Sequence, residues 1–388
     1  MRTKMRASVT VGGDDGARGG SARSRAYLAT VEELAQHVLA SLNQGQKHGK
    51  TRARQAQSAA SSMPVGKAGC AYLAWSFFLV AFGLRDAILV DEVRLSHEQQ
   101  HGFLDALAAC QKVLETDVCL LRHEPTGQLF ILSRSRTQER AQRRRTGREQ
   151  NPGPAAPSLQ VVQARAGQPV GKRFLRPSSA FEAAVAALSG LPAPVEGCLS
   201  SCVFELTTPS DVAVGLAGWL LGYPVIYSLE TASTSDISAP SSAVRIIYPH
   251  EAGPQRGQVA YEWEDGIANN LGGQPLHLFQ AELVSAAPAH SLVHLLAFSV
   301  PVTPSEPDAG VPGNVTTDEL QARVQHDLDR RRVQALDRLR DLLSSHDANA
   351  ESSNADLLWP ALDRFHHLLS GSTARVTPTQ VTLPLVAL

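Results

Sequence analysis

The chain has 388 residues, of which 43% are hydrophobic, and its formal net charge is -1 at pH 7. This length and apolar content predict one large or two ordinary folded domains with a sizeable core. The near-neutral charge disfavours a general role in binding nucleic acids or membrane surfaces.

The cysteines and the apolar runs indicate the compartment. The cysteine count is 5, an odd number, and no secretory signal peptide is recognised, so reduced thiols and a cytoplasmic location are expected. The longest apolar run, residues 70–84, is shorter than the ~20 residues that a membrane-spanning helix needs. It therefore predicts a buried core helix, and we expect no membrane partner.

The composition along the chain predicts one globular domain with two insertions. Residues 1–26 are rich in Gly, Ser and Arg and are expected to be disordered. An organelle transit peptide is the alternative for this segment, which the acids Asp14-Asp15 disfavour. Residues 27–388 are expected to fold as the domain, with disordered insertions at 44–66 and 134–176.

Apolar periodicity, capping signals and turn residues predict the elements of this domain in chain order. Helices are expected at 30–42, 67–82, 96–115, 178–189, 212–221, 317–345 and 356–369. Strands are expected at 85–93, 118–122, 128–133, 198–206, 225–229, 244–248, 276–284 and 292–300, of which the last two should pair antiparallel. The pattern predicts an α/β or α+β fold with a mixed sheet, helices on both faces and a C-terminal helical pair.

Residues 198–229 are expected to be the architectural centre, as one strand–helix–strand unit with a parallel crossover. Thr208 stands where a helix cap belongs, and Gly222 stands where a left-handed residue ends a helix. Gly215 and Gly218 indicate close packing of this helix against a sheet. The turn after the first strand lacks the GxGxxG pattern, which excludes the standard dinucleotide fingerprint.

The sharpest chemical motif is His97-Glu98-Gln99-Gln100-His101, an HExxH pattern on a predicted helix. Its two imidazoles could ligate zinc, with Glu98 as the general base for a metal-bound water, as in zinc-dependent hydrolases. The motif falls in the first turn of its helix, and its two central residues are polar. An exposed polar first turn, with Glu98 favourable to the helix dipole, is therefore the preferred interpretation.

An arginine-rich run occupies residues 134–148, where Glu139 is the one acid. Such a run could contact phosphate groups, which makes nucleic-acid contact an alternative function. No aromatic residue is interleaved for stacking on bases, so a solvated loop is the preferred interpretation.

Two further sets of residues could form a chemical site. Cys110 or Cys119 could form a thiol–imidazole pair with His123, although both cysteines lie in apolar patterns that suit small core residues. The carboxyl ends of neighbouring strands can form a ligand cleft. A cation site of that kind would use the acids Asp91, Glu92 and Glu230.

The segment Trp219–Tyr227 reads WLLGYPVIY. Together with Leu89-Val90-Asp91 and Phe298–Pro301, it resembles a family of uncharacterised proteins typified by a human chromosome 1 open reading frame. The resemblance covers about residues 65–133, 178–248 and 275–370. It implies a soluble intracellular protein of unknown function, and it transfers no activity, cofactor or catalytic residue.

The sequence predicts a soluble intracellular protein that acts through binding and has no catalytic residue, cofactor or metal ligand. Two alternatives remain: a zinc-dependent hydrolase using His97, His101 and Glu98, and nucleic-acid contact through residues 134–148. A protein partner is compatible with the sequence, whereas a nucleic-acid partner is disfavoured.

Overall fold

The structure is a computed structural model, and it describes about half of the chain. The described residues are 67–91, 93, 95, 99–100, 103–104, 110–111, 114–146, 160–164, 177–192, 203–209, 212–229, 242–247, 275–285, 291–302, 316–346 and 358–382. The predicted disordered segments 1–26 and 44–66 and the predicted helix 30–42 lie outside them.

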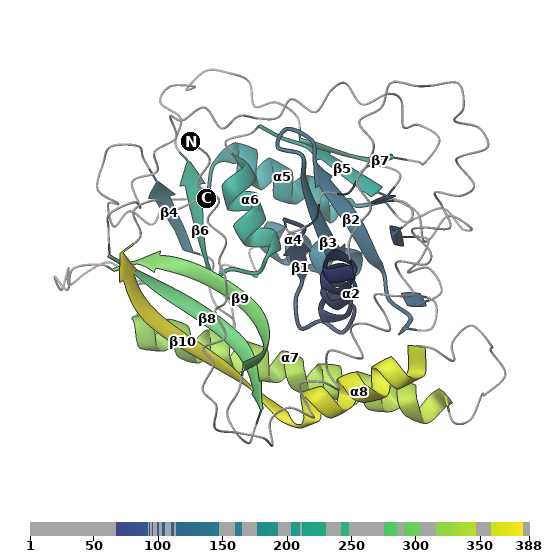
Figure 1. The fold of residues 1–388 in the computed structure, drawn as a ribbon. Coiled ribbons are helices and arrows are strands. Elements are labelled where there is room, and N and C mark those ends of the chain that lie inside the picture. The colour runs from purple at the N-terminus through teal and green to yellow at the C-terminus, as the bar shows by residue number, and fades with distance from the viewer. Residues whose placement is uncertain are drawn as a thin grey trace.

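A five-stranded mixed sheet forms the centre of the molecule (Figure 1). Its strand order is β1-β3-β2-β5-β7, in which β2 and β5 pair parallel and the other neighbours pair antiparallel. The strands are β1 (Ala87–Leu89), β2 (Val118–His123), β3 (Gln128–Ser133), β5 (Val203–Thr207) and β7 (Ala243–Ile247). This mixture of pairings, with helices, confirms the predicted mixed-sheet fold, of the α+β type.

Helices cover both faces of this sheet, as predicted. Successive side chains on a strand point to opposite faces, so each strand contributes to two cores. One face, with Leu120, Ile131 and Val203, packs on α2 (Lys67–Ala81). The other face, with Leu121, Phe130 and Phe204, packs on helices from further along the chain. These are α4 (Arg134–Arg145), α5 (Ser179–Ser189) and α6 (Ala213–Leu220).

A second unit is formed by the last part of the chain. An antiparallel sheet has the order β10-β8-β9, with β8 (Pro275–Ser285), β9 (Ser291–Pro301) and β10 (Ser372–Thr382). The long helix α7 (Thr317–His346) and helix α8 (Leu358–Ser370) pack with it along the lower edge of Figure 1. This arrangement confirms the predicted helical pair and the antiparallel pairing of β8 with β9.

The two units share one hydrophobic core. The cluster that contains Phe77 and Phe78 of α2 also contains Phe279 of β8 and Phe365 of α8. The Phe78 and Phe365 rings stack with centroids 5.7 Å apart. We call the contact between the five-stranded sheet with its helices and the C-terminal unit the seam.

Three elements were missed by the sequence analysis. Residues 134–145 form helix α4 and residues 160–164 form strand β4, so the prediction of a disordered insertion over 134–176 is wrong for these stretches. Strand β10 was also missed. Its inward residues Ser372, Ala374 and Val376 are small, and exposed Thr and Arg residues alternate with them. The sequence of such a strand shows little alternation of large apolar and polar residues, so it does not predict a strand.

The predicted strand–helix–strand unit at 198–229 divides between two sheets. Strand β5 is flanked by β2 and β7, so neither of its edges is free for β6 (Val225–Leu229). Strand β6 instead pairs parallel with β4 (Gln160–Ala164) in a separate two-stranded sheet. The prediction of a crossover within one sheet is therefore wrong, although its strands and helix exist.

The glycines of α6 have the predicted roles. Gly222 has φ +80, and its N–H and that of Tyr223 close the helix on the carbonyls of Trp219 and Gly218, which is a Schellman cap. A Cβ on Gly218 would lie 3.0 Å from Ile226 Cγ2, so the helix can approach β6 closely only with glycine there. Thr208 does not cap the helix, because its hydroxyl contacts His123 and the Pro209 carbonyl.

No helix among the described residues combines the length and apolarity needed to cross a membrane. The predicted core helix at 67–82 is α2, and its side chains lie among the buried residues of the core.

Candidate functional site

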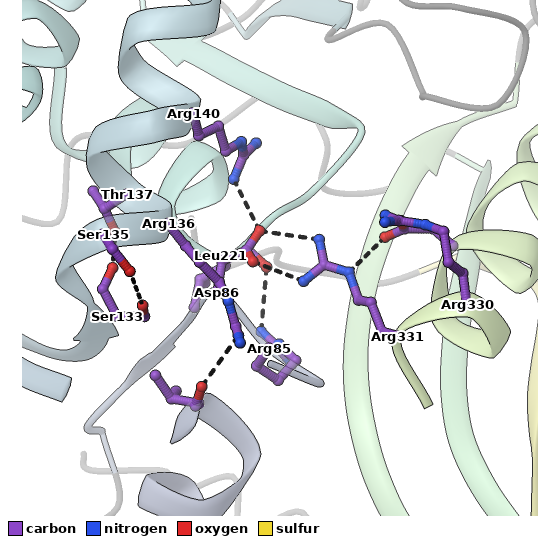
Figure 2. Close-up of polar contacts among 12 residues, drawn as sticks. Arg85, Asp86, Ser133, Ser135, Arg136, Thr137, Arg140, Leu221, Arg330 and Arg331 are labelled. Carbon is purple, nitrogen blue, oxygen red and sulfur yellow. Dashed lines mark hydrogen bonds and ion pairs between the residues drawn. The ribbon is translucent and has the colours of Figure 1, made fainter. Parts of the chain in front are cut away.

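Asp86 is the centre of the most heavily charged cluster in the described part of the chain (Figure 2). It directly precedes β1, and its side chain is 14% exposed. Arg331 of α7 donates from Nη1 and Nη2 to the two carboxylate oxygens at 2.7 and 3.0 Å. Arg140 of α4 adds a second guanidinium, with Nη1 at 3.7 Å from Oδ2. One carboxylate therefore joins β1, α4 and α7.

The predicted Arg-rich loop supplies part of this cluster as helix α4. Arg136, Arg140 and Arg144 recur every fourth residue and so lie on one face of the helix. Arg136 donates to the Val80 carbonyl at 3.3 Å, and Arg140 donates to the Trp219 carbonyl at 2.5 Å. The Arg140 guanidinium also lies over the Trp219 ring, 4.7 Å from its centroid. These contacts attach α4 to α2 and α6.

The remaining arginines of α4 have other intramolecular contacts. Arg144 forms a two-point ion pair with Glu182 of α5 at 3.1 and 2.7 Å. Arg143 is exposed and pairs with Glu139, four positions earlier on the same helix. Of the arginines predicted to contact nucleic acid, Arg136, Arg140 and Arg144 therefore bind carbonyl and carboxylate groups of the protein itself and join α4 to neighbouring elements. Arg148 lies outside the described residues.

A glycine makes room for this arrangement. Gly83 has φ +79, and a Cβ built there would lie 2.1 Å from Arg136 Nη1. The turn after α2 can therefore accept the guanidinium only because residue 83 has no side chain.

Arg338 of α7 makes a second connection across the seam. Its Nη1 donates to the Ala81 carbonyl at 2.8 Å, and its Nη2 donates to the Leu114 carbonyl at 2.6 Å. Its guanidinium also lies over the Phe82 ring. Arg331 and Arg338 lie seven residues apart, about two helical turns, so one face of α7 carries both connections.

The charges of the cluster are fixed near neutral pH. Burial by itself would raise the pKa of Asp86, but the positive charges of Arg331, Arg140 and Arg136 lower it well below the ordinary range. Burial opposes the charge of Arg331, yet Asp86 and Asp327 raise its pKa further above the usual value. These groups can bind and orient charged partners, but they do not exchange protons near pH 7.

Arg85 differs from the other arginines of the cluster. It is 7% exposed, and its one hydrogen bond is from Nη2 to the Leu221 carbonyl at 3.4 Å. Its Nε has no hydrogen-bond partner, and no carboxylate of the described chain forms an ion pair with it. Burial, and to a smaller extent the charge of Arg331, lower its pKa. This residue could not be singled out from the sequence, since one arginine before a strand carries no local pattern.

A second polar cluster lies at the carboxyl ends of β2 and β5. His123 is 1% exposed, with Nδ1 at 2.7 Å from Thr126 Oγ1 and Nε2 at 2.6 Å from Thr208 Oγ1. The Thr208 hydroxyl donates to the Pro209 carbonyl, which assigns the ring proton to Nε2. Burial lowers the pKa of His123 to about 4, so the ring is neutral. Since both ring nitrogens bind threonines, the thiol–imidazole pair with Cys110 or Cys119 is not formed.

Glu205 forms a cross-strand ion cluster beside this histidine. It is fully buried on β5 and lies in register with Arg122 of β2 and Arg245 of β7. Arg122 binds one carboxylate oxygen, and Arg245 binds the other, with Nε at 2.7 Å. This cluster connects three neighbouring strands, and no local sequence pattern indicates it.

The HExxH motif is described only in part. His97, Glu98 and His101 lie outside the described residues. Gln99 and Gln100 are buried, and Gln100 Nε2 donates to the Leu95 carbonyl at 3.1 Å. The expected exposed first turn is therefore wrong at these two positions. Among the described residues, no three His, Cys, Asp or Glu side chains gather as a metal site.

The acids proposed at strand ends are also described only in part. Asp91 is exposed after β1, and one of its oxygens lies 3.3 Å from the Tyr72 hydroxyl. Glu92 and Glu230 lie outside the described residues. The cation site predicted from these three acids therefore stays a prediction.

Comparison of the chain with family models, with curated proteins and with solved structures returns no significant match.

Proposed function

We propose that this protein acts by binding a ligand at the seam and not by catalysis. The observation that carries the proposal is the cluster at Asp86, where arginines from α4 and α7 converge on one carboxylate. Guanidinium groups stay protonated in proteins, and a strongly paired carboxylate is a weak base. The cluster is therefore suited to recognition and orientation of a charged group, and unsuited to proton transfer.

The position of the cluster supports the same proposal. Ligand sites occur preferentially where two structural units meet. Asp86 belongs to the central sheet and Arg331 belongs to the C-terminal unit, so a ligand beside them would contact both units. Its binding free energy would then add to the stability of the seam.

The experiment is a thermal-shift screen of the full chain against a panel of metabolites, followed by calorimetric titration of each compound that raises the melting temperature. The expected result is a saturable ligand that mass spectrometry recovers chemically unchanged after incubation. An Asp86→Asn variant should bind it more weakly, whereas Asp337→Asn, which removes an exposed pair with Arg340, should bind it normally. Conversion of the ligand to a product would contradict the proposal.

Metal analysis of the same sample tests the zinc-dependent hydrolase alternative. Binding without catalysis predicts zinc far below one ion per chain. Stoichiometric zinc that is lost in His97→Ala and in His101→Ala would instead support the hydrolase.

A further inference from the structure

Arg85 is a buried cation with spare hydrogen-bond donors. Its Nε is buried without a partner, and its one hydrogen bond is long, at 3.4 Å. Buried polar groups in folded proteins are almost always hydrogen-bonded, and a buried charge without a partner is costly. Such a group in a folded protein calls for an explanation, and a bound anion is the simplest one.

The neighbouring charges leave the cluster positive. Asp86 is already engaged by Arg331 and Arg140, and Asp327 is engaged by Arg330 and Arg331. Arg85 and Arg136 instead donate to the carbonyls of Leu221 and Val80, and neither forms an ion pair with a carboxylate of the described chain. These two guanidinium groups leave two positive charges without a paired carboxylate, which match the charge of a phosphate dianion better than that of a carboxylate.

A further donor lies beside Arg85. Tyr223 follows the left-handed Gly222 and packs against Phe298 of β9, with ring centroids 5.7 Å apart. Burial raises the pKa of the Tyr223 phenol, the charge of Arg85 lowers it and the charge of Asp91 raises it, so the hydroxyl stays protonated. Within the described chain this hydroxyl has no hydrogen-bond partner. A guanidinium and a hydroxyl donor are the usual groups that bind phosphate oxygens.

His294 of β9 completes the surroundings. Its Nδ1 lies 4.0 Å from Glu282 Oε1 of β8. Burial lowers the pKa of His294, the charge of Glu282 raises it and the charge of Arg85 lowers it. Arg85 therefore lies between three segments: the start of β1, the turn at Gly222 and strand β9. Two of these belong to the central sheet and its helices, and the third belongs to the C-terminal unit.

We propose that Arg85 and the Tyr223 hydroxyl bind the phosphate group of a small-molecule ligand at the seam. Arg85 provides a forked pair of N–H donors, Tyr223 provides one O–H donor, and the excess charge of the arginine cluster attracts the dianion. This assignment rests on the proposed function, and it adds the chemical class of the ligand.

The test is calorimetric titration of the full chain with inorganic phosphate, glycerol phosphate and acetate, at constant ionic strength maintained with chloride. We expect saturable binding of both phosphate compounds and weaker binding of acetate. If phosphate produces no more heat and no higher melting temperature than chloride does at the same ionic strength, the proposal is wrong. Equal binding of acetate would overturn the assignment of phosphate.

Variants locate the site. Arg85→Gln removes the charge with a shorter, neutral polar side chain and should weaken phosphate binding by about tenfold or more, while Arg85→Lys should recover part of it. Tyr223→Phe keeps the ring against Phe298, removes one hydrogen bond and should weaken binding about fivefold. Arg143→Gln, at an exposed residue of α4, is the matched control and should bind as the wild type does.

The possible outcomes separate the two proposals. If Arg85→Gln fails to fold, Tyr223→Phe decides, and unchanged phosphate affinity in that variant overturns the site. If phosphate does not bind, but another compound binds and loses affinity in Asp86→Asn, the assignment of phosphate fails and the proposed function stands. If no compound binds at all, both proposals fail.

Discussion

Arg331 and Asp86 lie 245 positions apart in the sequence and form a two-point ion pair with N–O distances of 2.7 and 3.0 Å. The pair joins helix α7 to the first strand of the central sheet. Because it is largely buried, its loss leaves charged groups in a poorly solvated place. The connection of the two units therefore depends on a few long-range polar contacts as well as on the shared core.

Replacing Asp86 with Asn tests how much the stability of the protein depends on this ion pair. Removal of one partner from a buried pair costs about 3–5 kcal/mol, because the opposite charge stays buried. We expect Asp86→Asn to lower the free energy of unfolding by about 3 kcal/mol, measured by urea denaturation.

The matched control is Asp337→Asn, which breaks the exposed pair with Arg340 on α7. It should change stability by less than about 0.5 kcal/mol. Equal effects of the two variants would show that the pair at Asp86 contributes no more than a surface pair does.

Glu205 gives a second test of buried charge. Glu205→Gln leaves Arg122 and Arg245 without their carboxylate, and we expect a loss of about 3 kcal/mol in the free energy of unfolding. Arg245→Gln removes a partner whose side chain is 70% exposed, and should cost less than about 1 kcal/mol. A larger loss of unfolding free energy in Arg245→Gln than in Glu205→Gln would contradict the assignment of Glu205 as the centre of the cluster.

The sequence predicted the strands of the central sheet better than the site, for a physical reason. Leu120 and Leu121 lie in different cores because successive side chains of a strand point to opposite faces of the sheet, and this alternation is a local property. The arginines of α4 have partners that are far away in sequence, such as the carbonyls of Val80 and Trp219. Composition alone made this run resemble a solvated loop, and no local pattern identifies a distant carbonyl as the partner of an arginine.

The end of α6 offers a test of backbone conformation. Gly222 has φ +80, and a residue with a Cβ in this region costs roughly 1–2 kcal/mol. Gly222→Ala should therefore lower the free energy of unfolding by about 1 kcal/mol in chemical denaturation. Gly190, at the end of α5, has φ -102 and serves as the control, because alanine there is unstrained and should be neutral or slightly stabilising. A neutral Gly222→Ala would exclude the left-handed cap.

The partners of helix α4 lead to a prediction about proteolysis. A solvated Arg-rich loop would be cut rapidly by trypsin, whereas α4 is helical and its arginines Arg136, Arg140 and Arg144 are bound to other elements. Cleavage within 134–145 should therefore require unfolding, and the rate should rise in parallel with the unfolded fraction in urea. Mass spectrometry of the fragments over time measures this rate. Rapid cleavage under native conditions would contradict the helix.

His123 predicts how stability depends on pH. Its pKa in the folded protein is about 4, against about 6.5 in an unfolded chain. The unfolded state therefore binds more protons between these values, so its population rises as pH falls. Stability contributed by the neutral ring is complete above pH ~6.5 and is lost as pH falls from ~6.5 toward ~4, by at most about 3 kcal/mol. Asp86 has a lowered pKa, so its contribution to stability is lost only at more acidic pH, below its ordinary pKa.

Urea denaturation at several pH values measures the slope of the free energy of unfolding against pH. This slope should be smaller in His123→Asn than in the wild type. It should be unchanged in His367→Asn, a substitution on the exposed side of α8. If His123→Asn retains the full slope, the buried imidazole is not its source.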